Sequence, residues 1–196
     1  NKVSARELVE NCLAAIDNPE GEGQRAFIST YHDRAQQQAD MVDQARKRGW
    51  GVPKFAGIPL SIKDLFDEAG RVTKAGSTVL RAATPAIQDA SVVARLKAAG
   101  FIVIGRTNMT EFAFSGLGTN VHYGTPRSPY ERDPKNPEIG RVSGGSSSGS
   151  AVSISDRMAV ATIGSDTGGS TRAPAAFCGI VGFKPTTNRM PSHGIF

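Results

Sequence analysis

The sequence predicts an α/β domain built on a largely buried sheet. Two helical patterns come first, apolar strand-like runs recur from residue 57 onward, and helix-like segments separate those runs. The 196 residues suit one domain or slightly more, and a chain of this length can bury a sizeable core. Its hydrophobic content of 39% and charged content of 21% are ordinary for a globular protein, so nothing in the composition opposes this class.

Two helices are expected before residue 50. The capping box Ser4-Ala5-Arg6-Glu7 opens the first, and a second runs from about Tyr31 to Arg48 and ends at Gly49. Their inward residues recur every three or four positions: Leu8, Val9, Cys12, Leu13 and Ile16 in the first, and Ala35, Ala39, Val42 and Ala45 in the second. Residues 1–50 are therefore expected to form an N-terminal helical layer of a single domain that spans 1–196.

Strands and helices alternate after residue 57. The expected strands are 57–63, 101–104 and 158–163, with 179–185 as a further candidate, and the expected helices are 89–100, 107–114 and 171–177. Residues 115–150 are irregular and rich in Gly, Pro and Ser. So long a loop in a compact domain is usually functional or disordered. Because strong core signals follow it, we expect it to be ordered around a site.

Charge and cysteine usage restrict the partners. The net charge is +5, and the compact basic run Arg46-Lys47-Arg48 suits the end of a helix better than a nucleic-acid surface. Cys12 and Cys178 are far apart and lack metal-type spacing, so we expect reduced core residues, no metal and a cytoplasmic protein. No apolar stretch is long enough for a membrane span. The chain stops within an apolar phrase, which suggests the front part of a longer protein.

The stretch Gly164–Thr171 carries the strongest chemical signal. It follows an apolar run and combines an exposed serine with a Gly-Gly turn, which supplies a nucleophile and backbone N–H groups for an oxyanion. His32, His122 and His193 do not stand beside a serine motif, which disfavours a Ser-His-Asp triad. Gly145–Gly149 matches a nucleophile elbow in letters, but no strand precedes it.

Lysine offers another route to an activated serine. Lys63 is charged within an otherwise apolar phrase, so it is either a buried base or a strand-end lysine that reaches water. A non-enzyme alternative also stays open, because Gly/Ser loops with clustered N–H groups can form an anion- or phosphate-binding module. The loop lacks the Gly-Lys-Ser/Thr ending of a P-loop.

Several segments together resemble the amidase signature family. They are Gly57–Asp64, Thr107–Ala113, Gly144–Ala151 and Gly164–Arg172 continuing to Pro185, and they occur in the family's order. Ser146 and Ser170 are also separated by the expected 24 residues. The resemblance implies a mixed β-sheet flanked by helices on both faces, of which this chain forms an N-terminal part.

The resemblance also implies a Ser-Ser-Lys triad. Ser170 matches the nucleophile, Ser146 the serine that follows a cis peptide bond, and Lys63 the general base. The backbone N–H groups of Thr167, Gly168, Gly169 and Ser170 match the oxyanion hole, and the region of Phe112 and Ala113 matches a wall of the substrate pocket. A lysine base needs its pKa lowered from about 10.4 to roughly 7–8, which burial can supply. Asp166 and Arg172 are expected to support the loop.

The function implied by this resemblance is a cofactor-free amidase that cleaves a small carboxylic amide through an acyl-enzyme on Ser170. The A subunit of a tRNA-dependent amidotransferase, which releases ammonia from glutamine, and an allophanate hydrolase are alternatives within the family. The expected partners are a small-molecule amide and, in a homodimer, a second copy of the chain, with no nucleic acid or membrane.

Overall fold

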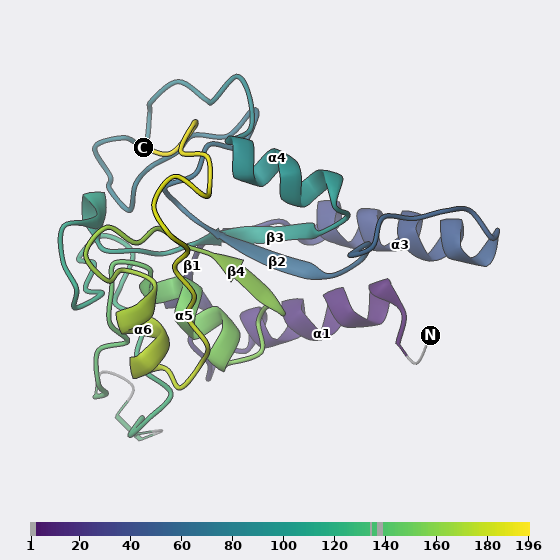
Figure 1. Cartoon of the computed structure of the whole chain (residues 1–196). Helices are drawn as coiled ribbons and strands as arrows, with labels where there is room; N and C mark the ends of the chain where they lie inside the picture. The colour runs from purple at the N-terminus through teal and green to yellow at the C-terminus, as the bar shows by residue number, and fades with distance from the viewer. Residues whose placement is uncertain (1–2, 134, 137–138) are drawn as a thin grey trace.

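A four-stranded mixed sheet in the order β1-β3-β2-β4 forms the centre of the molecule. The computed structural model describes residues 3–133, 135–136 and 139–196. The strands β2 (Pro59–Lys63), β3 (Ile102–Thr107) and β4 (Ala161–Ile163) run parallel, and β1 (Phe27–Thr30) is antiparallel to β3. Helices cover both faces of the sheet (Figure 1), which confirms the expected fold class.

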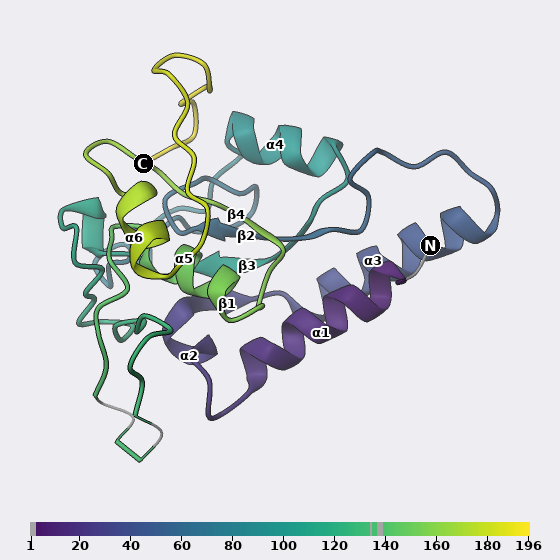
Figure 2. The ribbon, with the colours of Figure 1, turned by 60° about the horizontal axis from the view of Figure 1, so that its bottom comes forward.

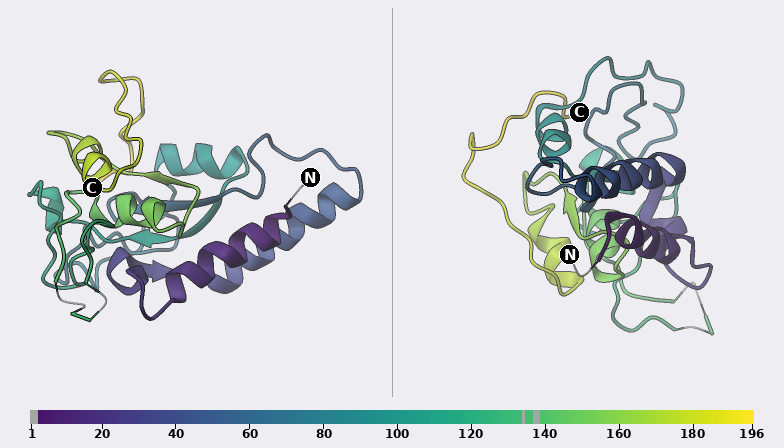
Figure 3. Two further views of the ribbon diagram at one scale, coloured as in Figure 1. Left: turned by 90° about the horizontal axis from the view of Figure 1, so that it is seen from below. Right: turned by 90° about the vertical axis from the view of Figure 1, so that its right-hand side faces the viewer.

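Two long helices pack side by side on one face of the sheet (Figures 2 and 3). The first, α1 (Ala5–Asp17), begins at the capping box, where the Ser4 hydroxyl accepts the Glu7 N–H at 3.0 Å. The second, α3 (His32–Lys47), has Arg46 and Lys47 in its last turn, where cations offset the helix dipole. Both predicted helices are therefore confirmed.

Two elements between these helices were not expected from the sequence. They are the short helix α2 (Gly23–Ala26) and the edge strand β1. Because β1 pairs with β3, more than seventy residues later in the chain, residues 1–50 contribute to the sheet as well as to the helical layer.

Each face of the sheet has its own apolar core. Strand residues alternate in direction, so Ile104 packs with α1, α3 and α5 (Ser148–Ser155), whereas Val103 packs with α4 (Ser91–Ala98). Every residue of β2 and β3 is buried. Lys63 therefore ends a strand that is covered on both sides.

The predicted helix over 107–114 is wrong. Thr107 completes β3, and only a short 3-10 turn, η1 (Glu111–Ala113), follows. Asn108 explains the difference, because its N–H donates to Ala26 O and its side-chain amide donates to the carbonyl oxygens of Arg25 and Gly124. These long-range bonds stabilise an extended chain where local propensity favours a helix.

The predicted strand over 179–185 is also wrong. In the described part of the chain these residues pair with no strand, and Val181 and Phe183 are 95% and 79% exposed. A strand needs a hydrogen-bonded neighbour, which an apolar pattern alone does not supply. The neighbouring predictions hold, since α6 (Arg172–Phe177) and β4 lie where the sequence places a helix and a strand.

The structure bears on two simpler predictions. Cys12 and Cys178 are both buried and unpaired, as expected of core thiols. Over the residues with described positions, no helix has the length and apolar character needed to cross a bilayer.

Gly149→Ala is predicted to destabilise the fold although alanine favours helices. A Cβ at Gly149 would overlap the carbonyl oxygen of Ala26 and lie 2.7 Å from the backbone nitrogen of Asn108. Overpacking of this kind costs about 1–3 kcal/mol, which should lower the denaturant midpoint of the full-length protein. Gly51→Ala is the control because its Cβ would have no neighbour within 4 Å. Equal midpoints for the two variants would contradict this account of α5 packing.

Candidate active site

Three parallel strands end at one edge of the sheet, and the residues singled out from the sequence gather there. Lys63 ends β2 and lies opposite Thr107, the last residue of β3. Ile163 ends β4, and the Gly164–Thr171 loop follows directly. The carboxyl edge of a parallel sheet is where α/β proteins commonly bind ligands. This edge is the candidate active site.

Lys63 is enclosed by the protein and bonded to two hydroxyl groups. The residue is 0% exposed, and its Nζ donates to Ser146 Oγ at 2.6 Å and to Ser165 Oγ at 2.7 Å. Burial lowers the pKa of Lys63 from 10.5 to about 7, while the charge of Asp166 acts in the opposite direction. Its complete burial rejects the alternative of a lysine that reaches water.

Ser146 is held through its backbone on two sides. The Gly145–Ser146 peptide bond is cis, as the family resemblance implies. The Gly145 N–H donates to Gly116 O at 2.8 Å, and Ser146 O accepts the Thr110 N–H at 3.1 Å. The residue is also fully buried. Its hydroxyl group is therefore fixed against Lys63.

Ser170 is half-buried just before α6. Its carbonyl oxygen accepts the Ser147 N–H at 3.2 Å, which joins the loop to the residue after Ser146. Among the described residues, no hydrogen bond joins the Ser170 hydroxyl to the Ser146 hydroxyl. The structure thus brings Lys63 and Ser146 into contact and links Ser170 to them through the backbone.

Asp166 organises the loop that carries Ser170. Its carboxylate accepts the N–H groups of Gly169, Thr171 and Arg172 at 2.8 to 3.2 Å. The Arg172 side chain adds two bonds of 3.0 Å. The Arg172 guanidinium, followed by the backbone donors, holds the pKa of Asp166 well below its usual range. The expected supporting roles of Asp166 and Arg172 are confirmed.

The four backbone donors predicted for an oxyanion differ in their contacts. The Gly169 N–H is already donated to Asp166. Those of Thr167, Gly168 and Ser170 have no hydrogen-bond acceptor within the part of the chain that the structure describes. A Cβ at Gly168 or Gly169 would meet nothing within 4 Å, and Gly169 has a φ of +124° that favours glycine. Thr167, Gly168 and Ser170 remain the candidate donors.

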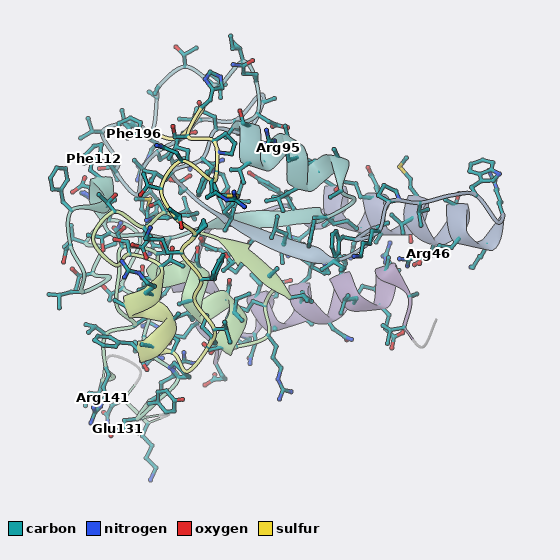
Figure 4. The ribbon with its side chains drawn as sticks, in the orientation of Figure 1. Arg46, Arg95, Phe112, Glu131, Arg141 and Phe196 are labelled. Atoms are coloured by element: carbon teal, nitrogen blue, oxygen red, sulfur yellow. The ribbon has the colours of Figure 1, made fainter. Side chains whose placement is uncertain are left out.

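The predicted pocket wall lies in the η1 turn. Phe112 and Ala113 both have positive φ, 51° and 62°. The ring of Phe112 packs against that of Phe196, with centroids 5.8 Å apart. Figure 4 shows these two rings at the opposite end of the molecule from Arg46. The predicted wall thus carries an aromatic contact. Its role in substrate binding stays a prediction.

Ser165 is a contact of Lys63 that was not expected from the sequence. It lies in the stretch that was singled out, two residues after β4, and β4 pairs directly with β2. This strand order brings Ser165 to the end of β2. The signal in the sequence was only its position after a predicted strand.

The histidines lie in other contacts. His32 pairs with Asp17, His122 with Glu111, and His193 with Gln88. Over the described ranges, no group of three or more His, Cys, Asp or Glu side chains could hold a metal ion.

A family model called Amidase matches residues 7–196. The chain belongs to the Amidase family. This finding confirms the resemblance inferred from the ordered motifs.

Curated relatives and a solved structure agree with this membership. The chain is 42% identical to AtzE, a 1-carboxybiuret hydrolase subunit of Pseudomonas sp. (strain ADP), covering 100% of the chain and 41% of that protein. It is 43% identical to the A subunit of Glutamyl-tRNA(Gln) amidotransferase from Synechococcus sp. (strain WH7803), covering 99% and 38%. Native peptide amidase from Stenotrophomonas maltophilia superposes with a TM-score of 0.84 at 36% identity, covering 99% and 39%. The chain thus spans about two fifths of these relatives.

Arg172→Gln is predicted to shift amide hydrolysis by the full-length protein to higher pH. Asp166 would remain ionised at neutral pH, and its uncompensated charge would raise the pKa of Lys63 and reduce the uncharged fraction. The acidic limb of kcat/KM against pH should therefore move upward. Arg141→Gln is the control, since Arg141 pairs with Glu131 on the exposed surface (Figure 4). If the acidic limb of the profile stays in place or moves to lower pH, the charge of Asp166 does not act on Lys63 as described.

Proposed function

We propose that the full protein is an amidase that hydrolyses a small carboxylic amide through an acyl-enzyme on Ser170. The contact between Lys63 and Ser146 carries this proposal, because it joins a buried amine with a pKa of about 7 to a hydroxyl at 2.6 Å. Membership of the Amidase family supports the same chemistry. Lys63 is the base, Ser146 the relay and Ser170 the nucleophile.

The low pKa of Lys63 is the energetic basis of the proposal. A shift from 10.5 to about 7 corresponds to about 5 kcal/mol of destabilisation of the ammonium form. Folding supplies this destabilisation by burying the side chain. The uncharged amine is then ready to accept a proton at neutral pH, which is the condition for an efficient general base.

The proton moves from Ser170 to Ser146 and from Ser146 to Lys63 as Ser170 Oγ attacks the amide carbonyl. The N–H groups of Thr167, Gly168 and Ser170 stabilise the oxyanion that forms. The proton returns by the same route to the leaving nitrogen, the C–N bond breaks, and ammonia or an amine departs. Water then attacks the ester on Ser170 with the same proton relay and releases the carboxylate.

A second function uses the same residues on a different substrate. The similarity to the A subunit of Glutamyl-tRNA(Gln) amidotransferase favours an ammonia-releasing protein that acts on glutamine for a partner. Such a protein should hydrolyse glutamine alone among simple amides and should co-purify with partners. A stand-alone amidase should act on several amides without them. For either function we also propose a cytoplasmic location, which the unpaired Cys12 and Cys178 support.

Ser170→Ala is predicted to reduce amide turnover by roughly a thousandfold or more in the full-length protein, because loss of a nucleophile removes the covalent route. Released ammonia and free carboxylate report the rate. Ser148→Ala is the matched control, since it removes a buried hydroxyl that has no partner within the described residues. The control should keep its activity. Undiminished hydrolysis by Ser170→Ala would overturn the proposed function.

A further inference from the structure

Two opposite charges are buried directly behind the candidate site. Asp64 follows Lys63 and is 0% exposed, and Arg106 precedes Thr107 and is 2% exposed. Arg106 Nε donates to Asp64 Oδ1 at 2.6 Å. Arg106 lies opposite Ile62, which packs in the apolar core on the α4 side of the sheet. Thr107 instead binds Ser150 of α5, so the pair lies on the face away from the Lys63–Ser146 contact. The proposed reaction does not use the Asp64–Arg106 ion pair.

Arg106 also binds the chain on either side of a turn. Its Nη2 donates to Phe66 O at 2.8 Å and to Thr73 Oγ1 at 3.4 Å. Its Nη1 has no hydrogen-bond partner in the part of the structure that is described. Burial raises the pKa of Asp64 and Arg106 opposes that rise, so the charged form of Asp64 depends on Arg106.

Asp64 extends this network to a second loop. Its carbonyl oxygen accepts the Ala75 N–H at 2.9 Å, and its Oδ2 accepts the Gly76 N–H at 3.3 Å. Gly76 has a φ of +68°, and a Cβ there would lie 2.8 Å from Met109 O. The loop at 75–76 is thus held by Asp64 on one side and pressed against residue 109 on the other.

The same loop holds the predicted pocket wall. The Phe112 N–H donates to Ala75 O at 2.9 Å, and Asn120 bridges Gly76 O and Met109 O through its side-chain amide. On its other side the wall segment is tied to the catalytic pair, because the Thr110 N–H donates to Ser146 O. Residues 110–112 therefore lie between two anchors, Ser146 and the loop bound by Asp64.

We propose that Arg106 and Asp64 form a positioning pair, which holds the wall at Phe112 and Ala113 in register with Lys63 and Ser146. This role rests on the proposed function, since the wall must contact the acyl part of the substrate. A buried ion pair alone is weak evidence for stability, and fixing one geometry is the use that these contacts favour. The pair touches neither substrate nor the reacting atoms. Because it acts through the wall, its effect should appear in substrate binding.

The test compares Arg106→Met, Asp64→Asn and the double variant in the full-length protein. Arg132→Met is the matched control, because it breaks a half-buried pair with Asp156 that has no contact with the wall. Arg106→Met should raise KM, change the order of preference among amides of different acyl size, and lower kcat/KM about a hundredfold, as small misplacements do. The double variant should lose less, because it leaves no unpaired carboxylate.

Hydrogen exchange of the segment 108–116 gives a readout that does not need activity. Its amides, including the Phe112 N–H, should exchange faster in Arg106→Met than in Arg132→Met. If Arg106→Met does not fold, Asp64→Asn answers the same question, since it keeps an oxygen for Arg106 and loses the charge. Unchanged exchange in the folded variants would overturn the proposal. If the wild-type protein is active, an unchanged KM and an unchanged amide preference in the folded variants would also overturn the proposal. If the wild-type protein is inactive, the proposed function is rejected. The hydrogen exchange of segment 108–116 then decides alone whether Arg106 and Asp64 hold the wall.

Discussion

The desolvation of Lys63 is the interaction on which the rest of the site depends. Its two partners, Ser146 and Ser165, are neutral hydroxyl groups and do not replace the water that an ammonium group loses on burial. A carboxylate in contact would restore the charged form. Asp64, the next residue in the chain, and Asp166, whose charge acts on Lys63, are each bound by an arginine of their own. The fold thus keeps a buried amine apart from uncompensated negative charge.

Backbone contacts supply the rigidity that this arrangement needs. Asn108 is the clearest case, because its backbone and side chain bind Ala26, Arg25, Gly124 and, through its carbonyl oxygen, the Gly149 N–H. One residue therefore joins the end of β3 to α2, the long irregular loop and α5. In its described part, the loop before Ser146 has little regular structure, and bonds to Asn108, Glu22 and Asp156 hold it. Glycines at the closest approaches, such as Gly149, make these bonds sterically possible.

The sequence was most informative where the determining interactions are local. The capping box at Ser4 placed the start of α1, and an unexplained charge in an apolar run identified Lys63. Features that depend on distant partners were missed or wrongly predicted. β1 forms because β3 offers an edge, residues 107–114 stay extended because Asn108 binds remote carbonyl groups, and Ser165 reaches Lys63 only through the order of the strands. The local pattern of Gly164–Thr171 pointed to Ser170, whereas Ser146 was identified only from the order of the family's motifs.

The most direct test of a buried, uncharged Lys63 is its own titration. In the full-length protein with isotope-labelled lysine, NMR can follow the side-chain signal of Lys63 against pH, and the signal is assigned by its loss in Lys63→Met. The midpoint is expected near pH 7, well below the ordinary 10.5 of lysine. A midpoint near 10.5 would mean that Lys63 stays protonated under working conditions, and it would contradict its role as the base.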